Sequence, residues 1–372
     1  MSGIKDCVHG MISVSPIEER IIDTPEFQRL RYVKQLAFAN LIYPGANHTR
    51  FEHSLGTMHL AGTYCESLKL RGGKSQLLRL AGLLHDVGHM AFSHESEIVL
   101  ERYLGDHEKI GMEKIRTGEI GDIIKTQYTL PEFEKVFFGA GVGQAIHSDI
   151  GADRIDYIMR DGYYTGVGYG IVDHERVISQ AKYDSKNGLR VAQGGLEATE
   201  SLLISRFLMF STVYYHKTVR IAAAMIRKAI KDSVAKKEFD PRLAINMGDY
   251  DIMQELSKSS SGHIISDLKT RKLYKEAYSA PIIDEVLTRQ QAAKIEDEIF
   301  QKTGAEVIID VPTVSYKKAT LKVEMDGKLT NMEKASALVK SLEQSEKRRL
   351  KMLAICHERD KEKIRRECER IF

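Results

Sequence analysis

Histidines and aspartates gather in the first half of the sequence in a pattern that suits metal-dependent hydrolysis. Eight of the 13 histidines fall between residues 48 and 147, and histidine is both a common metal ligand and the side chain that titrates near neutral pH. His53, the dipeptide His85-Asp86 and the distant Asp153 form a candidate nitrogen and oxygen ligand set. Such a set leaves positions open for water or a substrate oxygen, as hydrolysis requires. A His-Asp pair alone is a weak signal, so core histidines stay the alternative at this point.

The elements that position these residues are predicted to be helices. Apolar periodic stretches predict helices over residues 51–70, 76–91 and 143–161. The second stretch is dense in Leu and Ala, so we expect a buried helix that carries His85 and His89 on one face, four residues apart. By the same spacing, Asp149 and Asp153 are expected to share one face of the third helix.

The pattern changes in the second half of the chain. Strands are predicted over residues 188–191, 306–311, 321–325 and 350–356, and helices over 332–342 and 359–371. We therefore expect a mainly α fold with three domains. These are a helical core over residues 1–240, a helical extension over 241–303, and a small α+β module over 304–372.

The composition excludes several classes of protein. The chain has 55 Lys and Arg against 52 Asp and Glu, a net charge of +3, which argues against a globally basic nucleic-acid coat. Its four cysteines are far apart and form no C-x-x-C pair, so a metal should be held by nitrogen and oxygen. No apolar run approaches the roughly 18 residues that span a bilayer. We expect a cytoplasmic protein without membrane contact.

The sequence resembles a known family over about residues 8–220. Its motifs are residues 21–31 (IIDTPEFQRLR), 43–46 (YPGA), 50–56 (RFEHSLG), 85–95 (HDVGHMAFSHE) and 156–161 (DYIMRD). Together with the order His53, His85-Asp86 and Asp153, they resemble the deoxynucleoside triphosphate triphosphohydrolase branch of the HD superfamily of metal-dependent phosphohydrolases. The resemblance implies that the helical core is an HD domain that hydrolyses a dNTP to deoxynucleoside and triphosphate.

The resemblance also implies roles for individual residues. One divalent metal ion per subunit would be bound by His53, His85, Asp86 and Asp153, and Mg, Mn, Fe, Co, Ni and Zn all suit these ligands. The catalytic set would be His107, His89, His94 and Asp161, with His107 near the α-phosphate. A histidine whose pKa lies near the working pH can transfer the proton that phosphate ester cleavage requires.

Substrate contacts are implied in the same way. Four side chains would neutralise the triphosphate, and three would hold the sugar: the first set is Arg50, Arg154, Tyr157 and Arg206, and the second is Gln35, Leu36 and Tyr214. Arginine suits phosphate because its guanidinium group donates two parallel hydrogen bonds. Arg154 replaces a lysine that is common in relatives. The sequence also departs from the family near Arg206, because a family histidine four residues later is Phe210 here.

Regulation and assembly are further expectations from the resemblance. Asp23, Gln28 and Arg31 match residues that read the guanine base of an effector in regulated relatives, although they could equally cap and pair along their own helix. The segment after Leu189-Arg190 offers no cation for the effector phosphates. We therefore expect a constitutive homo-oligomer, a dimer or tetramer, whose dNTP hydrolysis gains little from GTP.

Two other functions stay open at this stage. Another HD phosphohydrolase, such as a nucleotidase or a phosphodiesterase, would use the same ligands but need fewer cationic contacts. A non-catalytic nucleotide sensor or nucleic-acid-binding protein is the third reading. It is disfavoured because the full ligand set and His107 are present, and because glutamates alternate with the basic residues of the last helix.

Overall fold

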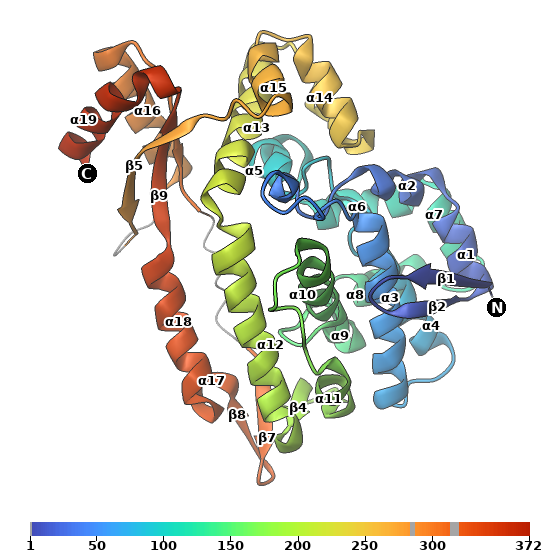
Figure 1. Cartoon of the computed structure of the whole chain (residues 1–372). Coiled ribbons are helices and arrows are strands. Elements are labelled where there is room, and N and C mark those ends of the chain that lie inside the picture. The colour runs from blue at the N-terminus through green and yellow to red at the C-terminus, as the bar shows by residue number, and fades with distance from the viewer. Residues whose placement is uncertain (1, 283–286, 313–319) are drawn as a thin grey trace. The chain divides into compact units, whose positions relative to one another are not determined.

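The computed structural model describes residues 2–282, 287–312 and 320–372 (Figure 1). The described residues form two compact units that interleave along the chain. The first unit contains residues 1–209, 241–252 and 319–340, and the second contains residues 210–240, 253–318 and 341–372. The predicted domain boundaries after residues 240 and 303 stay a prediction.

Helices dominate the first unit. Its helices are α1 (Pro16–Ile22), α2 (Pro25–Gln28), α3 (Arg50–Ser67), α4 (Gly73–Leu84), α5 (His94–Leu104), α6 (His107–Thr117), α7 (Glu119–Lys125), α8 (Leu130–Phe137), α9 (Gln144–His147), α10 (Ala152–Thr165), α11 (His174–Ser179), α12 (Leu196–Met209) and α17 (Met332–Ala335). Helix α3 starts with a capping box in which Thr49 and Glu52 satisfy backbone N–H groups of the first turn. Its apolar face packs against α4 and α10 around Leu55, Met58 and Ile155.

Two small sheets also belong to the first unit. Strands β1 (Ser2–Asp6) and β2 (Gly10–Val14) form an antiparallel hairpin. The second sheet has the order β3-β4-β7-β8, with β3 (Ala181–Asp184), β4 (Gly188–Ala192), β7 (Lys322–Met325) and β8 (Lys328–Asn331). Within it β4 and β7 are parallel, with Val191 opposite Val323. The sheet therefore joins residues that lie far apart in the sequence.

The second unit combines helices with a three-stranded antiparallel sheet. Its helices include α13 (Lys217–Ala235), α15 (Gly262–Lys269), α16 (Arg289–Thr303) and α19 (Lys361–Ile371), while α14 (Asp249–Ser257) and α18 (Ala337–Arg349) span unit boundaries. The sheet has the order β5-β9-β6, with β5 (Lys275–Pro281), β9 (Lys351–Cys356) and β6 (Val307–Asp310). Ile299, Val307 and Ile364 lie in the core between the sheet and its helices.

The mainly α fold with small C-terminal sheets is confirmed, and so are the predicted strands at residues 188–191, 306–311, 321–325 and 350–356. The hairpin β1-β2 and the strands β3, β5 and β8 were not predicted. No described helix is long and apolar enough to cross a membrane.

The predicted helix over residues 76–91 is wrong in its second half. Helix α4 ends at Leu84, and residues 85–88 form turns. Gly88 explains the difference, because a Cβ atom there would lie 2.0 Å from the carbonyl oxygen of His107 at the start of α6. This close backbone approach replaces a helical turn, so His85 and His89 do not share a helix face.

The predicted helix over residues 143–161 is also interrupted. It consists of α9 and α10, and Asp149 lies in the break between them. The Asp149 carboxylate accepts backbone N–H bonds from Thr320 (2.7 Å) and Leu321 (3.0 Å) instead of continuing a helix. Asp149 and Asp153 therefore do not share a helix face, and Asp153 stands in the first turn of α10.

Candidate active site

Four potential metal ligands converge from three elements of the first unit. His53 comes from α3, His85 and Asp86 from the turn after α4, and Asp153 from the first turn of α10. The Nε2 atom of His53 lies 3.2 Å from His85 Nε2, 3.1 Å from Asp153 Oδ1 and 3.6 Å from Asp86 Oδ2. His85 Nε2 lies 3.3 Å from Asp86 Oδ1. The structure thus brings together all four residues that the resemblance implies as ligands.

The donor atoms of this group fit a divalent ion. Ligand atoms bound at about 2.1 Å and at angles near 90–110° lie roughly 3.0–3.4 Å from one another, as most of these atoms do. His53 Nδ1 donates to Asp156 Oδ2 at 2.7 Å, and His85 Nδ1 donates to the Gly82 carbonyl at 2.8 Å. Both rings therefore present an Nε2 lone pair to the centre, the arrangement found in metal-binding histidines.

Electrostatics also favour a positive charge at this point. Burial alone would lower the pKa of His53, but its hydrogen bonds to Asp153 and Asp156 outweigh that effect and raise the pKa to about 10. Burial raises the pKa of Asp153, yet the hydrogen bonds to His53 and His85 lower it below its usual range. The group thus attracts a cation, and a divalent ion would take the place of the proton on His53 Nε2.

A buried ionic network stands behind His53 and was missed by sequence reasoning. Asp156 Oδ2 accepts from His53 and from Arg160 Nε at 2.9 Å, and Arg160 also donates to Asp6 Oδ2 at 2.8 Å. The side chains of Asp156 and Arg160 are fully buried. The i, i+4 spacing of Asp156 and Arg160, three residues after Asp153, was the available signal.

Gly56 on α3 leaves space for the side chains of this network. The added methyl group of Gly56→Ala should fill that space and disrupt the network. A Cβ atom at Gly56 would lie 1.8 Å from Asp156 Oδ1 and 2.5 Å from Arg160 Nη2. We expect a loss of roughly 3 kcal/mol of unfolding free energy from overpacking, measured by urea denaturation, and weaker metal binding. Gly73→Ala is the control, because its nearest neighbour lies 3.3 Å away. Equal stability of the two variants would contradict this expectation.

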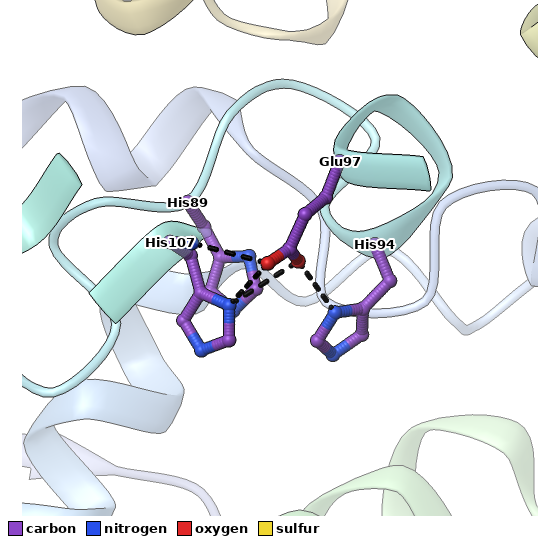
Figure 2. Close-up of side chains that lie close together, drawn as sticks. All are labelled: His89, His94, Glu97 and His107. Carbon is purple, nitrogen blue, oxygen red and sulfur yellow. Dashed lines mark hydrogen bonds and ion pairs between the residues drawn. The ribbon is translucent and has the colours of Figure 1, made fainter. Parts of the chain in front are cut away.

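A second cluster contains three of the four residues implied as catalytic, together with a glutamate (Figure 2). Glu97 on α5 lies between His94 and His107, and its carboxylate accepts from His107 Nδ1 at 3.0 Å and His94 Nδ1 at 3.0 Å. The His89 ring stacks on that of His107 at a centroid distance of 3.9 Å. His89 Nε2 also lies 3.3 Å from Asp86 Oδ1, which links this cluster to the metal ligands.

The cluster favours the protonated form of His107 and the neutral form of His89. Burial lowers the pKa of His107, but its hydrogen bond to Glu97 outweighs that effect and raises the pKa. The pKa of buried His89 is lowered well below its usual range by desolvation and by the charge of Arg50. Since Nδ1 of His107 donates to Glu97, its Nε2 atom is free to exchange a proton with a ligand. Glu97 was missed by sequence reasoning, although its i, i+3 spacing from His94 was visible.

Comparisons with known proteins identify the family of the chain. A model of the HD domain matches residues 50–138, and a model described as an HD associated region matches residues 172–372. The chain belongs to the HD-domain family. HD domains bind divalent metals, and His53, His85 and Asp153 form a group that could hold one, with Asp86 beside them.

Sequence similarity to several known proteins covers much of this chain. An uncharacterised protein of Methanocaldococcus jannaschii is 34% identical over 361 residues, covering 94% of this chain and 77% of its own. The deoxynucleoside triphosphate triphosphohydrolase SAMHD1 homolog of Dictyostelium discoideum is 28% identical over 76% of this chain and 60% of its own, and human SAMHD1 is 30% identical over 62% and 44%. A hypothetical protein of Aquifex aeolicus superimposes with a TM-score of 0.82 at 31% identity, covering 99% of both chains.

Of the residues implied to bind triphosphate, Arg50 directly contacts a candidate metal ligand, Asp86. Arg50 pairs with Asp86 and donates to Ser93 Oγ at 2.6 Å. Arg154 Nη1 donates to Asp149 Oδ1 at 2.6 Å. Burial raises the pKa of Tyr157, and the charges of Arg154 and Arg206 oppose that rise. Their role in phosphate binding stays a prediction.

The residues implied to bind the sugar come from both units. Gln35 and Leu36 follow the bridge between Lys34 and Thr49, and both are half-buried. The Gln35 Oε1 atom is buried and has no hydrogen-bond partner among the described residues, so it is available to a ligand. Tyr214 lies in a π-helical turn, Phe210–Tyr214, of the second unit.

Asp161 and the expected effector residues make local contacts. Asp161 Oδ1 lies 2.8 Å from His48 Nε2, and the His48 ring stacks on Tyr164. Arg31 donates to Gln28 Oε1 at 2.8 Å, and its guanidinium lies over the Phe51 ring. These contacts describe how the residues are held, while catalysis by Asp161 and guanine recognition by Asp23, Gln28 and Arg31 stay predictions.

Proposed function

We propose that this HD-domain protein hydrolyses deoxynucleoside triphosphates to deoxynucleoside and triphosphate. The observation that carries the proposal is the link between the two clusters, in which Asp86 faces the other metal ligands and also lies 3.3 Å from His89 beside His107. The relatives named as dNTP triphosphohydrolases support the substrate class, although this chain spans 60% and 44% of the two cited above.

The residues of the chain suit the chemistry at an α-phosphorus atom. A divalent ion held by His53, His85, Asp86 and Asp153 would supply Lewis acidity and lower the pKa of a bound water. Arg50, Arg154 and Arg206 would neutralise the charge of the phosphate oxygens. His107, whose pKa is raised by its hydrogen bond to Glu97, would donate its Nε2 proton to the 5′ oxygen of the leaving deoxynucleoside.

Product analysis tests this proposal directly. We expect dATP, dGTP, dCTP and TTP, with Mg²⁺, Mn²⁺ or Co²⁺, to yield deoxynucleoside and inorganic triphosphate by ion-exchange chromatography. Deoxynucleotides should be preferred to ATP, because the Gln35-Leu36 pair matches the sugar-binding pair of the family. Monophosphate and pyrophosphate as products would favour another HD phosphohydrolase. Equal rates on ATP and dATP would contradict the sugar-pocket assignment.

GTP is expected to stimulate this activity little, in a homo-oligomer that forms without it. An effector triphosphate would lack the charge-assisted hydrogen bonds that relatives supply after the Leu-Arg pair, each worth about 1.5–3 kcal/mol. The assay is dATP hydrolysis with and without GTP, together with size-exclusion chromatography. A tenfold activation with a shift to larger oligomers would reject the expectation.

A further inference from the structure

The N-terminal hairpin reaches the buried carboxylate behind His53. His9 follows β1 in the hairpin turn, and its Nε2 atom lies 2.6 Å from Asp156 Oδ1. The second oxygen of the same carboxylate accepts from His53 Nδ1 at 2.7 Å. The side chain of His9 is 2% exposed and that of Asp156 is 0% exposed. One buried carboxylate therefore bridges a metal-ligand candidate and a histidine 44 positions earlier in the sequence.

The turn that carries His9 is itself fixed. Asp6 Oδ1 accepts the backbone N–H groups of Val8 at 2.9 Å and His9 at 2.8 Å. Asp6 Oδ2 accepts from Arg160 Nη1 at 2.8 Å. Gly10 then reverses the chain with a positive φ of 73°, a conformation that favours glycine. Both the backbone N–H and the ring of His9 therefore make hydrogen bonds. A histidine without a structural role would not need both contacts.

Two other histidines lie beside His9 without sharing its contact. The His59 ring centroid lies 5.1 Å from that of His9, and the His174 centroid lies 6.5 Å away. Within the part of the chain that the structure describes, Asp156 accepts from His9, His53 and Arg160 and from neither of these two rings. His59 therefore offers a matched control in the same cluster of rings.

We propose that His9 is a positioning residue for the metal centre, acting through Asp156 on the direction and tautomer of the His53 ring. The inference rests on the metal site of the proposed function and extends it to the N-terminal hairpin. Because Asp156 keeps its pairing with Arg160 when the His9 ring is lost, the carboxylate stays charged but gains freedom to move. Metal affinity should then fall although all four metal ligands remain.

A pair of amide variants tests the inference in the full-length protein with Co²⁺ as the probe. The side-chain nitrogen of glutamine can take the place of histidine Nε2, whereas the shorter asparagine cannot reach Asp156. Co²⁺ affinity and its visible d–d absorption are measured by titration of the metal-free proteins. We expect His9→Asn to weaken Co²⁺ binding about 10-fold, the lower end of the effect of losing a direct partner of a metal ligand, because His9 lies one contact further out. His9→Gln and the control His59→Gln should bind like wild type.

Thermal melting of the metal-free variants separates positioning from folding. A purely structural role would lower the melting temperature of His9→Asn without changing the Co²⁺ affinity or spectrum of the folded protein, and that result would overturn the inference. Equal loss of affinity in His9→Asn and His9→Gln would also overturn it. If His9→Asn does not fold, His9→Ala takes its place in the comparison with His9→Gln.

Different results would reject the proposed function and the role of His9. Wild-type protein that binds Co²⁺ but leaves every dNTP intact would reject dNTP hydrolysis and leave the role of His9 standing. Unchanged Co²⁺ affinity in His9→Asn, with active wild-type protein, would reject the role of His9 alone. Absence of Co²⁺ binding by the wild-type protein would overturn both.

Discussion

Asp86→Asn is expected to remove most of the bound metal and to lower dNTP turnover by at least about 100-fold, since even an outer contact of a metal site costs 10–100-fold. The substitution removes a negative charge as well as a lone pair. It also leaves the buried guanidinium of Arg50, which pairs with Asp86, facing the ion without a carboxylate. Metal content per chain after dialysis, measured by mass spectrometry, and the rate of dATP hydrolysis should fall together.

Asp122→Asn provides the control for this prediction. Asp122 is 78% exposed on α7 and pairs only with Lys125 among the described residues, so the same substitution should leave metal content and turnover unchanged. The stronger variant His85→Ala/Asp86→Ala removes two ligands at once. Full metal occupancy in that double variant would show that the metal lies elsewhere.

His107→Ala is expected to keep the metal but to lose about 10²–10⁴-fold in turnover, the usual contribution of a general acid. His107 contacts Glu97 and stacks on His89, and it is not among the four converging metal ligands. Metal content should therefore match that of the wild type while dATP hydrolysis at saturating substrate falls. Undiminished turnover in His107→Ala would remove this residue from the mechanism.

The Glu97→Gln variant supplies a graded version of the same test. Glu97 raises the pKa of His107, so its charged form persists to higher pH in the wild type. An activity that needs protonated His107 is then complete below that pKa and is lost as the pH rises through it. Without the carboxylate the pKa falls, and the alkaline limb of the pH–rate profile should move to lower pH. An unshifted alkaline limb would argue against His107 as the acid.

The sequence predicted which candidate metal ligands lie close together. It predicted less well the backbone conformation that positions them. His53, His85, Asp86 and Asp153 were grouped by their order and types, and they do converge. The predicted helix around His85 was wrong because the Leu- and Ala-rich pattern reports burial and not backbone path. The turn there depends on the approach of Gly88 to α6, a contact between elements that local periodicity does not encode.

The supporting residues were missed for a related reason. Asp156 and Glu97 each act through a partner on another element or across a turn, and His9 is separated from Asp156 by 147 positions. Helix and strand periods predict which face of an element is buried, but not which buried polar groups will pair. Charged residues in a buried stretch, such as Asp156 and Arg160, were the available hint of a paired network.

The parallel pairing of β4 with β7 has a consequence for the order of folding. Val191 meets Val323 only after the ribosome has made the residues of the second unit that lie between them. Parallel pairing across so long a stretch of chain is slow, because loop closure must precede the contact. Until then the β4 edge is open to other chains. A fragment that stops at residue 240 would keep the metal ligands but leave that edge permanently open, and so would be prone to aggregate.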